Sequence, residues 1–138
     1  LLGKNCFVEI VSAPHPLYSC PCCGYLMSEG SPGSYQICKI CCWEDDAVQL
    51  LYLRRNGANP LSLIQAQENF VLFGASEERM LKHTRAPLPG DKRDSTWRPV
   101  DPARDRLESS GLHKTYMQIL SENVREPEEL YYWLKESS

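Results

Sequence analysis

Two pairs of cysteines, each with the spacing Cys-x-x-Cys, constrain this chain more than any other feature of its sequence. The first pair is Cys20 and Cys23, the second is Cys38 and Cys41, and fourteen residues separate the pairs. Two cysteines at this spacing can reach one metal ion from a single tight turn, and two such turns supply the four corners of a tetrahedral site. The spacing is close to a pattern that is typical of zinc. We therefore predict that these four thiolates bind one Zn²⁺ in a closed, structural site.

Each turn contains a third cysteine, which leaves alternatives for the ligand set. Cys22 could take the place of Cys23, and Cys42 could take the place of Cys41, although either exchange would break one Cys-x-x-Cys pair. A cysteine that binds no metal is commonly a small, buried apolar side chain. We expect this role for Cys42 and also for Cys6.

A thiol redox centre is another interpretation of a Cys-x-x-Cys motif. Redox motifs normally open a helix, whose N-terminus lowers the pKa of the thiol. Here Tyr18 and Ser19 precede the first pair and Gly24 follows it, which predicts a strand and a turn. Glycine suits the position after the second ligand, because a positive φ costs glycine little. A redox role would also leave the second cysteine pair unexplained, so we favour the metal site.

The number of cysteines also indicates a compartment. The chain of 138 residues contains seven, six of them between positions 20 and 42, and this does not fit the disulfide framework of a secreted domain. Metal thiolates in a reducing compartment fit better, so we predict a cytoplasmic protein. No apolar run approaches the roughly 18 residues that a membrane helix needs, and a signal peptide is not evident. We expect no membrane partner.

Charge is distributed unevenly along the chain, whose formal net charge is −3. Residues 1–78 carry −4, residues 79–106 carry +4 and residues 107–138 carry −3. The basic segment could contact phosphates, so a nucleic-acid-binding zinc ribbon is a further alternative. A solvated basic loop is the commoner explanation of such a segment. Aromatic residues also do not alternate with its basic ones, as a base-stacking surface would require.

Apolar runs bounded by turn-forming residues predict short β-strands around the cysteines. We expect strands at residues 7–11, 18–20 and 34–38. Residues 29–33, with the sequence Glu-Gly-Ser-Pro-Gly, predict a hairpin loop between the last two strands. This combination predicts a small zinc-ribbon β-hairpin around the metal site.

Several helices are expected after the hairpin. Ser62 and Gln65 form a capping-box pattern that opens a helix, and Gly74 is suited to end it. A shorter helix is expected to start at residues 76–79, and another N-terminus at residues 101–102 follows a proline-rich loop. Apolar residues at helical spacing extend this prediction toward the C-terminus: Leu112, Tyr116, Ile119, Leu120, Leu130, Trp133 and Leu134. We therefore predict an α+β fold, with the zinc-ribbon hairpin packed against several α-helices.

Three consecutive carboxylates, Glu44, Asp45 and Asp46, follow the second cysteine pair and Trp43. They could cap a helix, remain solvated, bind a cation, act in acid–base chemistry or contact a basic partner. Adjacent carboxylates usually point apart, which disfavours catalysis. A Ser/His/Asp pattern, a phosphate-binding glycine loop and a His-Glu-x-x-His motif are not evident, so we predict a non-enzymatic protein. We predict that the three carboxylates contribute to a protein-binding surface.

The residues around both cysteine pairs also resemble a known family. The segments that carry this likeness are 20–25, 33–38, 41–46, 48–50, 57–59, 62–63, 66–70 and 74–75. They resemble the bacterial cysteine-rich CPCC family over about residues 18–87. The resemblance implies a small zinc-binding module without an established reaction, and a protein partner such as a toxin that an immunity protein would neutralise. Cys42 stands where the family has an aromatic residue, which supports leaving it out of the ligand set.

The extent of the resemblance suggests how the chain is divided. We predict that residues 1–87 form a zinc-binding domain of the CPCC type. Residues 88–138 lie outside the likeness, and the apolar spacing described above predicts that they are helical. We expect this C-terminal extension to pack on the same core as the domain, because a short zinc domain has little core of its own.

Overall fold

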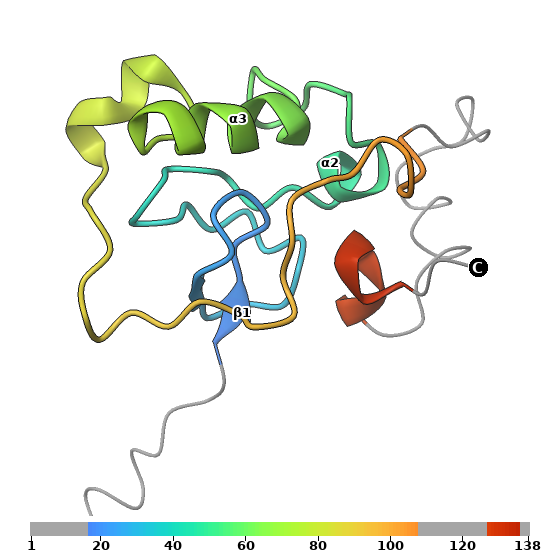
Figure 1. The fold of residues 1–138 in the computed structure, drawn as a ribbon, viewed down its shortest axis with the longest axis horizontal. Helices are drawn as coiled ribbons and strands as arrows, with labels where there is room; N and C mark the ends of the chain where they lie inside the picture. The colour runs from blue at the N-terminus through green and yellow to red at the C-terminus, as the bar shows by residue number, and fades with distance from the viewer. Residues whose placement is uncertain (1–16, 108–126, 136–138) are drawn as a thin grey trace, which may run out of the picture.

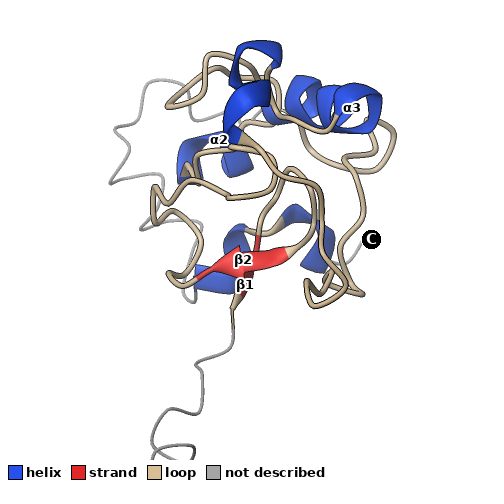
Figure 2. Ribbon diagram, turned by 90° about the vertical axis from the view of Figure 1, so that its left-hand side faces the viewer, coloured by secondary structure: helices blue, strands red, loops and turns tan. Residues whose placement is uncertain are grey.

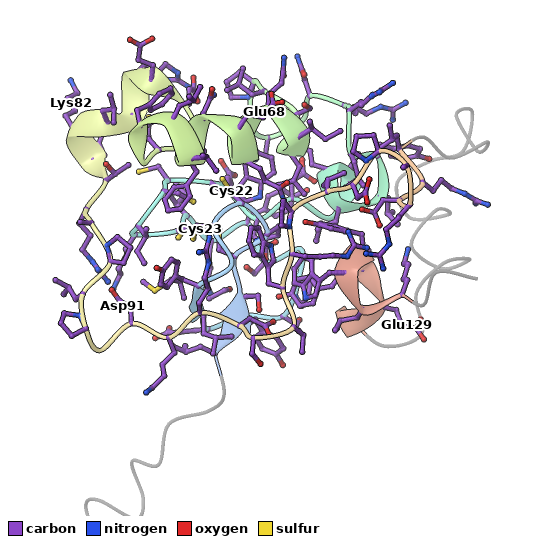
Figure 3. The ribbon with its side chains drawn as sticks, viewed as in Figure 1. Cys22, Cys23, Glu68, Lys82, Asp91 and Glu129 are labelled. Carbon is purple, nitrogen blue, oxygen red and sulfur yellow. The ribbon has the colours of Figure 1, made fainter. Side chains whose placement is uncertain are left out.

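The computed structural model describes residues 17–107 and 127–135. In this part of the chain, a small antiparallel sheet lies on one side and the two α-helices lie on the other (Figures 1 and 2). The segments that carry the cysteines run between these two sides (Figure 3). The described part of the chain is therefore α+β, as the sequence predicts.

The sheet forms across the first cysteine turn. β1 (Tyr18–Ser19) directly precedes Cys20, and β2 (Leu26–Ser28) pairs with it in the antiparallel sense, with an irregular register. The strand predicted at residues 18–20 is confirmed, although it is one residue shorter. Its partner is β2 and not the expected segment 34–38, so that part of the prediction is wrong.

Residues 34–38 do not form a regular strand. Tyr35 has a φ of 62°, and this left-handed conformation interrupts an extended run. The segment still lies antiparallel to the residues after the second cysteine pair, through an isolated bridge between Ile37 and Glu44. The turn-rich residues 29–33 do reverse the chain, but they connect β2 to this irregular segment.

α3 (Leu63–Phe73) begins and ends as the sequence predicts. The Ser62 Oγ accepts a hydrogen bond from the Gln65 N–H, and the Gln65 side chain accepts one from the Ser62 N–H, which completes the capping box. Gly74 ends the helix in the left-handed conformation, with a φ of 85°. The buried face of α3 carries Leu63, Ala66 and Gln67.

The other helices near α3 are short. α2 (Ala47–Leu51) starts at Asp46, whose side chain accepts a hydrogen bond from the Val48 N–H. The helix predicted to start at residues 76–79 is present as the 3₁₀ helix η1 (Glu78–His83). The Glu77 side chain at its N-cap accepts no hydrogen bond from the helix backbone, so this end lacks the cap that stabilises α3.

The C-terminal part is helical only in short turns where it is described. The start predicted at Asp101 gives a single turn, closed by the Arg104 and Asp105 N–H groups on the Asp101 oxygen. Two 3₁₀ helices follow, η2 (Pro127–Leu130) and η3 (Tyr132–Leu134). Predictions that lie outside the described residues concern the strand at 7–11, the burial of Cys6 and the helical positions at 112–120. No helix within the described ranges is both long and apolar enough to cross a bilayer.

One hydrophobic core connects both ends of the described chain. It includes the clustered cysteines, Trp43 and Leu63 together with Tyr131 and Trp133 near the C-terminus. Trp97, Val100 and Leu107 pack against the same core from the loop after residue 87. Residues on both sides of the predicted boundary at 87 therefore share one core, while the boundary itself stays a prediction.

Candidate metal centre

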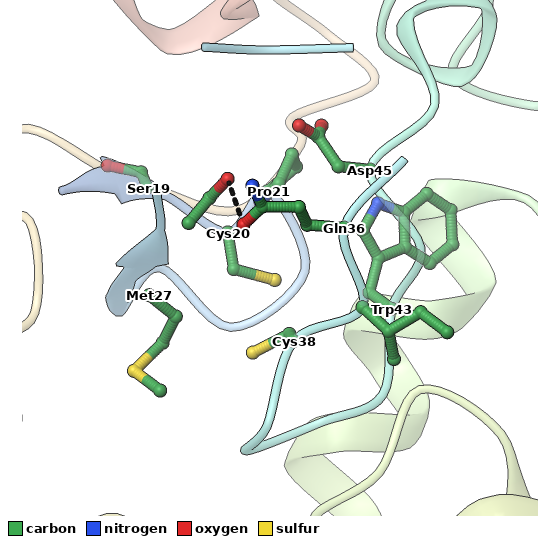
Figure 4. Close-up of a pocket in the computed structure, with 10 residues that line it drawn as sticks. Ser19, Cys20, Pro21, Met27, Gln36, Cys38, Trp43 and Asp45 are labelled. Carbon is green, nitrogen blue, oxygen red and sulfur yellow. Dashed lines mark hydrogen bonds between the residues drawn. The ribbon is translucent and has the colours of Figure 1, made fainter. Parts of the chain in front are cut away.

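Four sulfur atoms meet within this core. The Sγ atoms of Cys20, Cys23, Cys38 and Cys41 all lie within 4.8 Å of one another, and all four residues are buried. The distance from Cys20 to Cys41 is 3.5 Å, and that from Cys23 to Cys38 is 3.8 Å. Four sulfurs placed about 2.3 Å from one zinc ion, at tetrahedral corners, would stand about 3.8 Å apart. These cysteines could therefore hold one metal ion. Figure 4 shows Cys20 and Cys38 approaching each other from separate loops.

The spare cysteines of the two turns lie outside this cluster. Cys22 is buried on the side facing α3, and its Sγ lies 3.4 Å from the Ala66 carbonyl oxygen, to which it can donate (Figure 3). Cys42 is buried as well, and its sulfur is not one of the four that converge. The geometry thus favours Cys23 over Cys22 and Cys41 over Cys42.

The first knuckle, which we define as residues 20–25, is a closed turn. The Cys20 N–H donates to the Tyr25 oxygen at 2.8 Å, and the Gly24 N–H donates to the Cys20 oxygen at 2.8 Å. Gly24 has a φ of 80°, and a Cβ atom at this position would lie 2.6 Å from the Trp97 Cδ2. Both the backbone conformation and the close approach of the indole ring therefore require glycine here.

The second knuckle, residues 38–43, repeats this turn with a different residue at the critical position. The Cys38 N–H donates to the Trp43 oxygen at 2.9 Å, and the Cys42 N–H donates to the Cys38 oxygen at 2.8 Å. Cys42 takes the place of the glycine and has a φ of 68°. Because this conformation costs a non-glycine residue roughly 1 kcal/mol, Cys42 is best understood as a turn residue held by its surroundings.

The protonation of the cluster depends on burial and on the neighbouring sulfurs. Burial raises the pKa of the Cys20 and Cys41 thiols well above the usual value. Hydrogen bonds from the thiols of Cys20, Cys23 and Cys41 lower the pKa of Cys38. One thiolate is therefore stabilised by its neighbours, but further negative charge in this buried position needs a compensating cation. A bound dication would supply that compensation.

The family model described as Cysteine-rich CPCC matches residues 18–91, which is more than half of the chain. The chain belongs to the cysteine-rich CPCC family. The matched region contains all four clustered cysteines, both knuckles and α3. No curated protein and no solved structure matches this CPCC chain.

Asp45, one of three acidic residues that follow the CPCC knuckles, is used inside the fold. Its Oδ2 accepts hydrogen bonds from the Gly33 N–H at 3.0 Å, the Ser34 N–H at 3.1 Å and the Ser34 hydroxyl at 2.9 Å. Burial raises the pKa of the Asp45 carboxyl, and these hydrogen bonds counter part of that effect. The side chain closes the loop between β2 and the second knuckle.

Asp46 is also internal, and Glu44 is the most accessible of the three. Besides capping α2, Asp46 accepts a hydrogen bond from the Ala58 N–H at 2.8 Å, and only 4% of the residue is exposed. The backbone of Glu44 is held by the Asn59 side chain, while the residue itself is half-buried. The predicted partner-binding role of the three carboxylates stays a prediction. Because Asp45 and Asp46 are buried, Glu44 is the one of the three that a partner could contact.

Sequence reasoning did not identify Gln67 as part of the centre. Its Nε2 donates to the Pro21 oxygen in the first knuckle at 3.0 Å and to the Tyr132 hydroxyl at 2.8 Å. Its Oε1 accepts from the Val100 N–H at 2.9 Å. The available signal is that Gln67 lies four residues after Leu63, on the apolar face of α3, where a polar side chain needs buried partners.

Arg93 and Trp97 were missed as well. The Arg93 Nε donates to the Cys23 oxygen at 2.9 Å, and the Trp97 Nε1 donates to the Pro21 oxygen at 3.0 Å. Both residues lie in the basic, proline-rich segment whose sequence predicts only a loop. No local pattern indicates that this loop returns to the first knuckle, because the contacts join residues 70 or more positions apart.

The cavity that borders the sulfurs is small. Its volume is about 20 Å³, and Cys20, Cys38, Trp43 and Asp45 are among the residues that line it (Figure 4). A space of this size is suited to one water molecule. Small-molecule sites commonly enclose roughly 300 Å³ or more. The surroundings of the cluster therefore resemble a packed core more than a substrate pocket.

Proposed function

We propose that this CPCC protein is a non-enzymatic zinc-binding module, in which a zinc ion bound by Cys20, Cys23, Cys38 and Cys41 holds a zinc-ribbon-like core together. The observation that carries this proposal is the convergence of four buried sulfurs within 4.8 Å. Zinc suits such a set because it prefers tetrahedral thiolate coordination. Four protein ligands leave no open position for a substrate, which favours a structural role over a catalytic one.

The small amount of regular structure at residues 17–107 and 127–135 supports a structural role for the metal. The sheet consists of two strands of two and three residues, and the cysteines themselves form much of the core around it. Small folds with little regular structure commonly depend on a metal or disulfides for stability. In this proposal the bound ion supplies stability that a larger sheet would otherwise provide through its packing and hydrogen bonds.

We further propose that the module acts by binding another protein. Val71 and Leu72 lie side by side on α3 and are 84% and 77% exposed, and Ile37 beside the second knuckle is 57% exposed. Apolar side chains displayed in this way are suited to a protein interface. Glu44 could add a charged contact at the rim. The narrower proposal of an immunity protein with a toxin as its partner is supported only by the family resemblance.

The alternatives receive less support from the structure. Of the eight basic residues at 79–106, three form ion pairs with acidic neighbours: Arg79 with Glu77, Arg85 with Asp91, and Arg98 with Asp105. This pairing reduces the charge available to a nucleic acid. For a redox role, Cys20 follows a β-strand and lies in a turn, without the helix N-terminus that activates a thiol.

The structural role is tested by unfolding the chain with and without its metal. Protein purified without chelator is expected to contain one zinc per chain, and removal of that zinc should abolish the cooperative unfolding transition seen by circular dichroism. A chain that keeps the same fold and unfolding midpoint after complete zinc removal would contradict a structural metal.

The binding role is tested by comparing two variants in affinity capture from cells of the source organism. A partner that binds the wild-type chain should be lost with the double substitution Val71→Ser and Leu72→Ser and retained with Glu68→Gln, an exposed change on the same helix. Retention of the partner by both variants would exclude this face of α3. Salt-sensitive recovery of DNA or RNA instead of a protein would favour the nucleic-acid alternative.

A further inference from the structure

Residues 92–97, which we name the clasp, run alongside the first knuckle, in the yellow to orange stretch that passes β1 (Figure 1). The Leu26 N–H donates to the Lys92 oxygen at 2.8 Å, and the Asp94 N–H donates to the Gly24 oxygen at 2.7 Å. The clasp therefore forms one backbone hydrogen bond with the first knuckle and one with the start of β2, which directly follows it. These residues begin immediately after the matched family region ends.

Two side chains of the clasp reinforce this attachment. Arg93 donates to the Cys23 carbonyl oxygen, and its guanidinium carbon lies 5.1 Å from the Tyr25 ring centroid and 5.0 Å from that of Trp97. Trp97 donates to the Pro21 carbonyl oxygen and covers the glycine of the knuckle with its ring. The carbonyl groups of residues 21, 23 and 24 thus all receive donors from the clasp.

The second knuckle has less support of this kind. Among the described residues, one hydrogen bond reaches its turn from beyond the neighbouring hairpin, from the Ser76 N–H to the Cys41 oxygen at 2.8 Å. Cys38 is the most exposed of the four clustered cysteines, at 7%, whereas Cys41 is as fully buried as Cys23. The two halves of the site therefore differ mainly in the number of hydrogen bonds that they receive from distant segments.

We propose that the clasp keeps the first knuckle closed, so that metal enters and leaves through the second knuckle, with Arg93 and Trp97 as the positioning residues. The inference rests on the proposed function, because it requires the four thiolates to hold a metal ion. It goes beyond that function by assigning a direction to metal exchange and a role to a segment outside the matched region.

The physical reason is that metal release requires at least one pair of thiolates to move away from the ion. Opening the first knuckle would break several hydrogen bonds to the clasp and separate the Trp97 ring from Gly24. Opening the second knuckle breaks fewer such contacts, so Cys38 and Cys41 should leave the metal first.

Site-resolved alkylation during zinc removal tests this order. The full, zinc-loaded chain is mixed with excess chelator and iodoacetamide, quenched at intervals, and analysed by fragmentation mass spectrometry. We expect Cys38 and Cys41 to be alkylated before Cys20 and Cys23. Global unfolding would instead expose all four together, so the labelling order separates directed opening from general loss of stability.

Substitutions in the clasp should change both the rate and the order. Arg93→Ala is expected to accelerate zinc release about tenfold, which corresponds to about 1.4 kcal/mol, and to bring labelling of Cys20 and Cys23 level with the other pair. Arg93→Lys keeps the charge without the Nε–H donor to Cys23 and should lie between Arg93→Ala and wild type. Arg104→Ala removes an exposed positive charge outside the clasp and should leave rate and order unchanged.

The outcomes separate this inference from the proposed function. Zinc-loaded wild type in which Cys20 and Cys23 are labelled first, or together with the second pair, would overturn the inference and leave the zinc module standing. The same release rate in Arg93→Ala and Arg104→Ala would also overturn it. A wild-type chain that binds no zinc would overturn both. Because Arg93 is exposed, its substitution should leave the chain folded, so the Arg93 variants decide the question.

Discussion

The first and second knuckles have the same internal hydrogen bonds, yet they are held by different parts of the chain. In each, the first cysteine donates to the residue five positions later and accepts from the residue four positions later. That fourth residue has a positive φ in both turns, but it is Gly24 in the first and Cys42 in the second. Trp97 covers the first of these positions and thereby excludes any side chain from it.

The geometry of the ligands and the contacts that hold them in place therefore come from different parts of the chain. The turn around a Cys-x-x-Cys pair is local, because its hydrogen bonds close within six residues. The support is long-range, since Arg93 and Trp97 reach the first knuckle from 70 and 76 positions away along the chain. Two turns with similar ligand geometry can therefore differ in stability and in the rate at which they open.

In both knuckles, substituting a metal ligand should change zinc content and folding far more than substituting a spare cysteine. Cys23→Ser and Cys41→Ser should lose zinc and most of the fold, because structural zinc sites contribute about 10 kcal/mol or more to folding. Cys22→Ser and Cys42→Ser should keep one zinc per chain. Elemental analysis with circular dichroism measures both properties. Equal zinc loss in Cys41→Ser and Cys42→Ser would show that the ligand in the second knuckle is misassigned.

The number of protons released on zinc binding should show which cysteines of the two knuckles are protonated in the metal-free chain. Burial raises the pKa of Cys20 and Cys41, so both are protonated at neutral pH and must each release a proton when the metal binds. Apparent zinc affinity should therefore rise with pH, by about 100-fold per unit if two protons are released.

Calorimetry of the metal-free chain in buffers of different ionisation enthalpy counts these protons. The lowered pKa of Cys38 means that this residue should contribute less than Cys20 or Cys41 to the count. Zinc affinity that is independent of pH between pH 6 and pH 8 would contradict the protonation described here.

Substitutions of Gly24 and Cys42, the two residues at positive φ, test whether the Trp97 ring makes the first position less tolerant than the second. Gly24→Ala should destabilise the chain by about 2 kcal/mol, because it adds a strained φ and places a Cβ against Trp97. Cys42→Gly should change stability by less than about 1 kcal/mol, since relief of strain offsets the added freedom of the unfolded chain. Chemical denaturation of the zinc-loaded variants gives both values. If both substitutions change the free energy of unfolding equally, the contact with Trp97 does not make the first knuckle less tolerant of a side chain.

The smallest expected effect concerns the buried amide that joins the first knuckle to the C-terminal residues. Gln67→Leu should cost about 1–2 kcal/mol, because Val100 and Tyr132 each lose a buried hydrogen-bond partner. Glu68→Leu, on the exposed side of α3, is the matched control and should have little effect on the denaturation midpoint. A similar loss from both would mean that Gln67 matters only for helix propensity.

Sequence patterns predicted the features whose causes are local. The Ser62 capping box, the Gly74 end of α3 and each of the two cysteine turns depend on residues a few positions apart, and the structure places them as expected. Residue type and spacing were sufficient for these features, because side-chain hydrogen bonds at a helix end and tight cysteine turns form within one segment.

Features that depend on distant parts of the chain were missed or wrong. The strand pairing was also wrong, although its causes are local: a positive φ at Tyr35 interrupts the strand expected at 34–38, and β1 pairs with β2 directly across the first cysteine turn. The burial of Asp45 and Asp46 reflects loops that fold back onto them. Nothing near Arg93 in the sequence indicates that it contacts Cys23, because that contact exists only once the core has formed.

X-ray absorption at the zinc edge, on protein purified without chelator, identifies both the bound metal and the atoms that ligate it. We expect one zinc per chain with four sulfur neighbours at about 2.3 Å and no nitrogen or oxygen bound to the ion. The same spectrum should be obtained from Cys22→Ser and Cys42→Ser. A zinc ion with a nitrogen or oxygen ligand, or purified protein without zinc, would contradict a metal centre formed by Cys20, Cys23, Cys38 and Cys41.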